Sequence, residues 1–202
     1  MLLNPIYPTL DMLIFQEHDW CDFYGDAKEA IPPNATEPRG KDTDLIIFFD
    51  SDHAGYKLTR RSITGYIIFL NNATIAWFYK KQATIETSVF GAEFVAMKIG
   101  MKTLWGLRYK LCMMGVPISG PYLISGGNMS VIHNTHRPES ISKKKLNSIC
   151  YHVIRESVAM QECLTGHVPS VENLKDICTK VVPGGANWKH LIGKVLNDLY
   201  EQ

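Results

Sequence analysis

The chain has 202 residues, of which 46% are hydrophobic and 20% charged, so it holds enough apolar material for one domain plus an extension. No segment is apolar for long enough to cross a membrane, and Met1–Pro5 does not resemble a signal peptide, so we expect an intracellular protein with no membrane partner. The net charge of +1 gives no argument for or against a nucleic-acid partner, and five widely spaced cysteines without a C-x-x-C pair argue against a disulfide framework or a zinc site.

Residues 1–43 differ in composition from the rest of the chain. They hold a cluster of prolines and no regular apolar period, and Gly40, Lys41 and Asp42 close the segment. We expect an extended linker arm here, followed by a domain over residues 44–182 and a C-terminal helical extension over residues 183–202.

The domain opens with a continuous apolar run over residues 45–49 that ends in Asp50. A run apolar on both faces predicts a central strand covered on both sides, with Asp50 at the carboxyl end where open α/β sheets bind ligands. Residues 64–70 and 74–79 predict two further strands joined as a hairpin. We expect Tyr66, Trp77 and Phe78 to be core residues of these strands rather than platforms for base stacking.

Helices alternate with strands in the remainder of the chain. Thr87 and Ser88 offer an N-cap for a long, mostly buried helix that ends near Gly115. The later predicted elements are a strand at 122–125, helices at 128–134 and 143–161, a strand at 163–168, and helices at 170–180 and 188–200. This order predicts an α/β fold, a mixed sheet with helices on both faces.

Three acids fall at the edges of separate predicted elements. Asp50 ends a strand, Glu93 lies in the first turns of a helix and Asp176 lies in a later helix. Hydrolysis of a phosphodiester by two divalent cations needs carboxylates that converge in this way, and Mg²⁺ prefers oxygen ligands. Taken singly, Asp50 could simply end a strand and Asp176 could be a solvated helix acid, whereas a charge at Glu93 in an apolar helix favours a specific role.

Basic residues cluster near the turns. Arg60, Arg61, Lys80 and Lys81, together with the run 143–145, could contact the phosphates of a hybrid duplex. An ordinary solvated surface accounts for each cluster equally well. His133 and His136 have no third ligand nearby in the sequence, so we expect no zinc site there.

The ordered motifs resemble the ribonuclease H domain of copia-type retrotransposon Pol polyproteins over residues 45–180. They are D-x-D-x-A-G from Asp50, R-R-S-x-x-G from Arg60, the tryptophan strand with K-K-Q ending at Gln82, A-E-F-x-A around Glu93, Y-H-x-I-R-E from Tyr151, and V-P-x-x-x-N-x-x-D-x-x-T-K from Val168. The arm resembles, more weakly, the linker that follows the reverse transcriptase in such polyproteins.

This resemblance implies a ribonuclease H-like mixed sheet, with three antiparallel strands followed by parallel ones. It implies hydrolysis of the RNA strand of RNA–DNA hybrids with Mg²⁺ or Mn²⁺ held by Asp50, Glu93 and Asp176, and Asp52 as a possible auxiliary acid. The implied partners are the hybrid and a reverse transcriptase domain of the same polyprotein.

Two departures from the family pattern bear on activity. The family motif D-N-x-S reads Gly127-Asn128-Met129-Ser130 here, so one metal-binding acid is missing and the second metal site is expected to be weak. Lys145-Leu146-Asn147-Ser148 replaces a K-H-I-D stretch, and His152 could be structural. One alternative is a catalytically inactive nucleic-acid-binding or scaffold remnant of this domain. Another is a transposase-like enzyme of the same superfamily, but the K-K-Q and V-P-x-x-x-N motifs argue against it.

Overall fold

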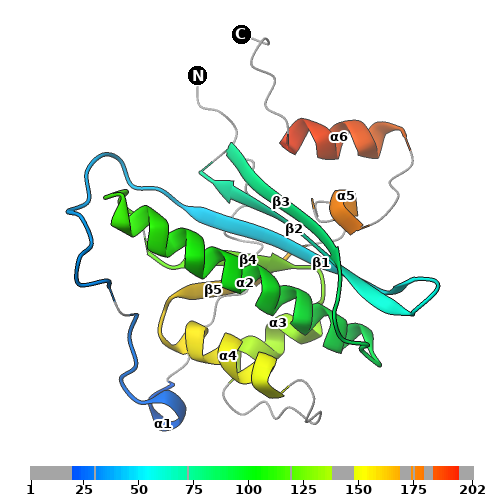
Figure 1. Ribbon diagram of the computed structural model, residues 1–202, viewed down its shortest axis with the longest axis horizontal. Coiled ribbons are helices and arrows are strands. Elements are labelled where there is room, and N and C mark those ends of the chain that lie inside the picture. The colour runs from blue at the N-terminus through cyan, green and yellow to red at the C-terminus, as the bar shows by residue number, and fades with distance from the viewer. Residues whose placement is uncertain are drawn as a thin grey trace.

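The computed structural model describes residues 20–29, 31–71, 73–118, 120–137, 148–168, 174, 176–179 and 184–195. Strands and helices alternate along this part of the chain as the sequence predicts (Figure 1). In chain order the elements are α1 (Cys21–Tyr24), β1 (Leu45–Tyr56), β2 (Arg61–Leu70), β3 (Ala73–Lys81), α2 (Val89–Met113), β4 (Tyr122–Gly126), α3 (Met129–His136), α4 (Ser148–Ala159), β5 (Cys163–His167), α5 (Asp176–Thr179) and α6 (Ala186–Val195).

The five strands form one mixed sheet in the order β3-β2-β1-β4-β5. β1 pairs antiparallel with β2, and β2 with β3, while β1–β4 and β4–β5 are parallel. β1 is therefore the central strand, which confirms the prediction from its apolar run. Its residues from Leu45 to Ser51 are all buried, as expected for a strand that is covered on both faces.

Side chains alternate between the two faces of the sheet. Leu45, Ile47 and Phe49 of β1 belong to a large core with the buried residues of α2, α3 and α4. Ile46 and Phe48 belong to a smaller core on the opposite face, which we call the outer face and which carries α5 and α6 (Figure 1). Helices thus lie on both faces, as predicted.

The long helix α2 begins where the sequence places its N-cap. The Ser88 hydroxyl accepts a hydrogen bond from the Gly91 backbone N–H at 3.1 Å, which satisfies one of the free donors of the first turn. Phe94, Met97, Met101 and Leu104 follow at helical spacing and are fully buried against the sheet. No helix in the described part of the chain is long and apolar enough to cross a membrane.

The described part of the arm is attached to the helical side of the domain. The Trp20 side chain joins the large core, and the guanidinium of Arg155 in α4 lies 4.9 Å from the centre of its ring. Arg108 of α2 pairs with both carboxylate oxygens of Glu29. The predicted domain boundaries at residues 43 and 182 stay predictions.

One sequence expectation about the core is wrong. Tyr66 is buried and Phe78 packs beside the core, but the Trp77 side chain is 75% exposed. β3 is an edge strand, and Trp77 points to the outer face, where no described element covers it. A local apolar pattern identifies the strand but does not show whether both of its faces are covered.

Candidate functional site

Asp50 lies near the middle of β1, on the outer face and beyond the point where β4 stops pairing. The parallel ladder of β1 and β4 ends at the pair Phe48–Ser125, whereas β1 continues to pair with β2 and sets Asp50 opposite Gly65. The Asp50 side chain is only 2% exposed. Burial of a carboxylate is costly unless other groups bind it, so this acid has a specific environment.

The short helix α5 lies directly over this row of the sheet. The hydroxyl of Thr179 donates a hydrogen bond to Oδ2 of Asp50. Gly65 permits this approach, because a Cβ atom there would lie 2.6 Å from Cγ2 of Thr179 and 2.9 Å from Cβ of Cys178. Burial and the neighbouring charge of Asp50 raise the pKa of the Cys178 thiol to about 11.

Asp176 is the first residue of α5, three positions before Thr179. The backbone of this helix is therefore held at Asp50, although the side chain of Asp176 lies outside the described residues. Sequence reasoning placed Asp176 in a helix and quoted Thr179 only as part of a motif. Nothing in the sequence indicated that Thr179 would bind Asp50.

Gly127 is the residue after β4 and stands level with Asp50 of β1. Each residue lies two positions past the last parallel pair, Phe48–Ser125, so the register of the two strands brings both to the same edge. Gly126, just before it, packs against Phe49, since a Cβ atom at Gly126 would lie 2.4 Å from the Phe49 ring. Gly127 does not have the left-handed φ that favours glycine, so its backbone conformation does not exclude an aspartate.

Glu93 enters from the opposite layer, in the first turns of α2, and is 4% exposed. The side-chain amide of Gln82 fixes this turn to the sheet. It donates to the carbonyl of Ala92 at 2.9 Å and to the hydroxyl of Thr64 at 3.0 Å. Thr64 pairs with Ser51, the residue after Asp50, so Gln82 holds the first turns of α2, which carry Glu93, one row along the sheet from Asp50.

Two buried oxygen atoms lie beside this junction, Oγ of Ser51 and Oε1 of Gln82, and neither has a hydrogen-bond partner. Buried polar atoms are usually satisfied by protein or by ordered water. Their presence beside the residues that flank Asp50 and Glu93 marks a polar environment in this part of the sheet. Gln82, the last residue of the K-K-Q motif, thus holds the first turns of α2 to the sheet, a role that its position in the sequence did not indicate.

Asp52 lies on the same face of β1 as Asp50, two residues further along, and is partly exposed. Its carboxylate lies so close to Gly55 that a Cβ atom there would be 1.8 Å from Oδ2. The carboxylate is therefore directed into the β1–β2 connection.

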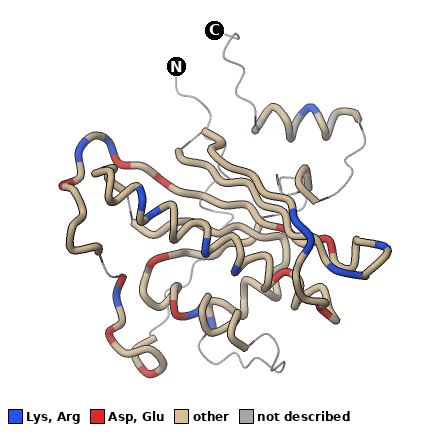
Figure 2. The backbone as a smooth tube through the Cα atoms, in the orientation of Figure 1, with Lys and Arg blue, Asp and Glu red and all other residues tan. Residues whose placement is uncertain are grey.

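The four predicted phosphate contacts gather at one end of the sheet. Arg60 and Arg61 come from the turn and start of β2, and Lys80 and Lys81 from the end of β3 (Figure 2). Lys80 pairs opposite Thr64, one row from the row of Asp50, and Nζ of Lys81 lies 3.7 Å from the ring centre of Tyr56. The basic run 143–145 lies outside the described residues. His152 is exposed, and its Nδ1 lies 3.5 Å from the hydroxyl of Tyr24 in the arm.

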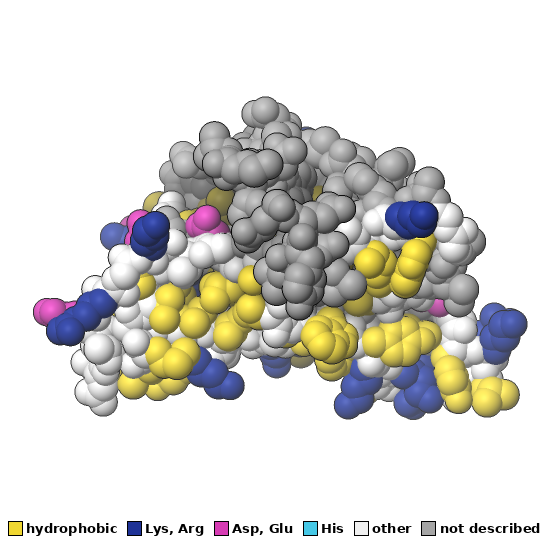
Figure 3. All heavy atoms as spheres, turned by 90° about the horizontal axis from the view of Figure 1, so that it is seen from above, with side chains coloured by type: hydrophobic (Ala, Val, Ile, Leu, Met, Phe, Trp, Pro, Cys, Tyr) yellow, Lys and Arg dark blue, Asp and Glu magenta, His cyan; other side chains and the backbone are white. Residues whose placement is uncertain are grey.

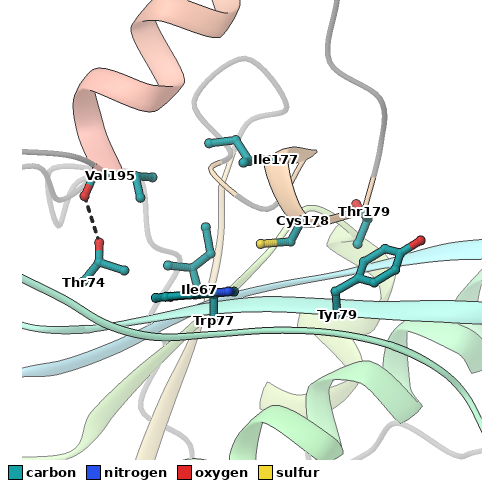
Figure 4. A pocket seen from close by; sticks show the side chains of 8 residues that line it. All are labelled: Ile67, Thr74, Trp77, Tyr79, Ile177, Cys178, Thr179 and Val195. Carbon is teal, nitrogen blue, oxygen red and sulfur yellow. Dashed lines mark hydrogen bonds between the residues drawn. The ribbon is translucent and has the colours of Figure 1, made fainter.

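The outer face is hollowed between the hairpin β2–β3 and the helices α5 and α6. The hollow has a volume of about 450 Å³, and we call it the outer groove (Figure 4). Ile67, Trp77 and Tyr79 form its floor, and α5 and Val195 of α6 form its sides. Apolar side chains are visible on this face in the space-filling view, with basic groups beside them (Figure 3).

Comparison with models of protein families gave no match. Among curated proteins, the chain is 28% identical over 142 residues to the retrovirus-related Pol polyprotein from transposon RE1 of Arabidopsis thaliana, which covers 70% of this chain. It is 30% identical over 145 residues, 71% of this chain, to the Pol polyprotein from transposon TNT 1-94 of Nicotiana tabacum. The matched segments span only 10% and 11% of those relatives.

Solved structures share the fold at low sequence identity. The ribonuclease H1 LC11, solved in complex with an RNA/DNA hybrid, has a TM-score of 0.50 at 14% identity and covers 64% of this chain and 88% of its own. Ribonuclease H1 from Halobacterium salinarum has a TM-score of 0.50 at 12% identity, with 67% of this chain and 93% of its own covered.

Proposed function

The homologues of this chain are Pol polyproteins of copia-type retrotransposons and its fold is ribonuclease H-like, and from that premise we propose that it acts on RNA–DNA hybrids. The proposed reaction is hydrolysis of the RNA strand with Mg²⁺ or Mn²⁺. Asp50, Glu93 and Asp176 are the proposed ligands, and the absence of an acid at Gly127 impairs the reaction.

One observation carries this proposal. Three of the four positions belong to segments that lie together near the middle of β1: Asp50 is buried there, α5, which begins with Asp176, is bound to it through Thr179, and Gly127, the residue after β4, stands level with it. Gln82 ties Ala92, the residue before Glu93 in α2, to Thr64 of β2, one row along the sheet from Asp50. Elements that are far apart in the sequence therefore lie together around Asp50, and this arrangement supports the proposal.

Among the described residues no three His, Cys, Asp or Glu side chains form a group that could hold a metal ion, and the side chain of Asp176 lies outside those residues. The proposed site for one divalent cation therefore needs the carboxylate of Asp176 beside those of Asp50 and Glu93. Asp50 and Glu93 supply hard oxygen ligands, which Mg²⁺ prefers, and the carboxylate of Asp176 would add a third. When bound, such cations polarise a phosphoryl oxygen and stabilise charge on the attacking and leaving oxygens. Thr179 holds the orientation of the Asp50 carboxylate, and Gln82 holds the turn that carries Glu93. Arg60, Arg61, Lys80 and Lys81 bind hybrid phosphates in this proposal.

Gly127 supports a second candidate function from a different class. Without a carboxylate at this position the site loses one oxygen ligand and about one negative charge, so a second cation is held poorly. A chain in this state would bind hybrids without cutting them, as an inactive nucleic-acid-binding or scaffold domain. An association with a reverse transcriptase domain of the same polyprotein fits either candidate.

The substitution Gly127→Asp separates the two candidates. We expect the unmodified chain to cleave a labelled hybrid very weakly in Mg²⁺, and Gly127→Asp to gain cleavage together with tighter Mg²⁺ binding measured by calorimetry. Gly106→Asp is the matched control, because Gly106 of α2 has open space around its Cβ position and lies far along the helix from Glu93.

Brisk cleavage by the unmodified chain would contradict the impairment. A folded Gly127→Asp variant that gains neither Mg²⁺ affinity nor cleavage would instead favour the binding domain. The phosphate contacts are tested separately, because neutral substitution of each basic residue should weaken hybrid binding and lower the salt slope by about one.

A further inference from the structure

From the outer groove we infer that this domain has a second nucleic-acid site, which binds a single strand by stacking its bases on Trp77 and Tyr79. The inference does not require cleavage, and it rests on the proposed function only in that the groove opens beside Asp50. Three observations carry it: the exposure and spacing of the two aromatic rings, the charge of the surrounding elements, and the continuity of the groove with Asp50.

The two rings are unusually accessible for an apolar strand. The side chains of Trp77 and Tyr79 are 75% and 62% exposed, and both project from the outer face of the edge strand β3. Residues two apart on a strand lie about 6.6 Å from one another on the same face. The Trp77 ring is seen edge-on along the sheet, so one ring face is turned toward the groove (Figure 4). Exposed aromatic rings on a sheet surface are a common platform for unpaired bases.

The residues that line the groove are uncharged, and the cations that favour a nucleic acid lie at its border. Lys81 lies two positions past Tyr79 on the same face of β3, and Lys189 of α6 is exposed. Lys80 and Lys81 continue β3 directly beyond Tyr79, and both are exposed. Aromatic faces flanked by cations favour a strand that offers bases and phosphates together.

The groove also begins at the candidate site. One row across the sheet joins Asp50 of β1, Gly65 of β2 and Tyr79 of β3. Thr179, which binds Asp50, also lines the groove. Adjacent strands are about 4.8 Å apart, so Tyr79 lies roughly 10 Å from the Asp50 position along this row. A strand that leaves a duplex at the candidate site can therefore reach the groove within a few nucleotides.

The test measures binding in EDTA, where cleavage plays no part. The probes are fluorescein-labelled oligo(dT) and oligo(U) of about 15 nucleotides, a length that fits the usual site size of such grooves. We expect anisotropy to report binding by the unmodified chain and a loss of about 10-fold or more in Trp77→Ala and Tyr79→Ala. Trp77→Phe should retain most of the affinity. Tyr109→Ala is the matched control, because Tyr109 is 55% exposed on α2, on the other face.

A second comparison locates the strand relative to a duplex. A hybrid with a single-stranded overhang should bind more tightly than the same blunt hybrid, and Trp77→Ala should remove the difference while blunt-hybrid affinity stays unchanged. The inference is overturned if neither oligonucleotide binds up to about 100 µM, or if Trp77→Ala and Tyr109→Ala behave alike. It is also overturned if Trp77→Ala weakens blunt-hybrid binding equally, or if its effect is to abolish self-association of the chain, which would assign the groove to a second copy.

Discussion

The two faces of the sheet differ in how much apolar surface they bury. On the side of α2, α3 and α4, the described residues form a core of 20 buried side chains, built largely on a helix of 25 residues. Within the same described part of the chain, the outer face has a core of six, covered by helices of four and ten residues. Hydrophobic stabilisation scales with buried area, so the helical face supplies most of the stability. The outer face is left free to carry the buried Asp50, the short helix over it and the exposed aromatic rings.

The largest expected effect comes from truncating one aromatic side chain on each face. Phe94 is fully buried on the helical side, so Phe94→Ala should lower the free energy of unfolding by about 3–5 kcal/mol. Trp77→Ala removes an exposed ring and should change it by less than about 1 kcal/mol. Urea unfolding followed by circular dichroism measures both. Similar losses for the two variants would show that the outer face is a second core, and would contradict the contrast drawn above.

A smaller effect is expected where the helical face meets the candidate site. Gln82→Met keeps the approximate volume of the side chain but removes its hydrogen bonds to Thr64 and Ala92, so we expect a loss of about 1–3 kcal/mol. Thr84→Ala is the control, because Thr84 is exposed and its hydroxyl bonds to the carboxylate of Glu86, and this substitution should cost less than about 0.5 kcal/mol. If Gln82→Met costs no more than the control, Gln82 does not hold the start of α2.

The smallest effect is a change in the chemistry of one thiol on the outer face. Because burial and the charge of Asp50 raise the pKa of Cys178 to about 11, its alkylation by iodoacetamide should be slow at pH 9 and increase toward pH 11. The raised pKa also makes stability depend on pH. Its contribution to the free energy of unfolding is fully present below pH 9, the ordinary pKa of the thiol, and is lost as the pH rises through about 11.

Asp50→Asn removes the neighbouring charge and should accelerate alkylation of Cys178 at pH 9, as measured by peptide mass spectrometry. Asp52→Asn, directed toward Gly55 instead, should leave the rate unchanged. Equal rates in Asp50→Asn and the unmodified chain would show that burial alone, and not the charge of Asp50, raises the pKa of Cys178.

Local patterns were sufficient to predict most elements of the fold. The apolar run of β1, the hairpin of β2 and β3, and Ser88 as the cap of α2 each depend on interactions between neighbours in sequence, and the structure has them at the predicted places. The boundaries were less accurate, because β1 continues to Tyr56, six residues past Asp50, by pairing with β2. Strand length depends on the partner strand, which a local pattern does not contain.

For the site, the sequence by itself determined which acids and bases are present, that Asp50 ends an apolar run and that Gly127 has no carboxylate. Only the tertiary structure decided that Gly65 lets α5 lie on the sheet, that Thr179 binds Asp50, that Gln82 ties α2 to Thr64, and that Trp77 is exposed. The physical reason is that each of these contacts joins residues from different elements. Their packing follows from strand register and helix placement, and a residue type at one position does not specify either.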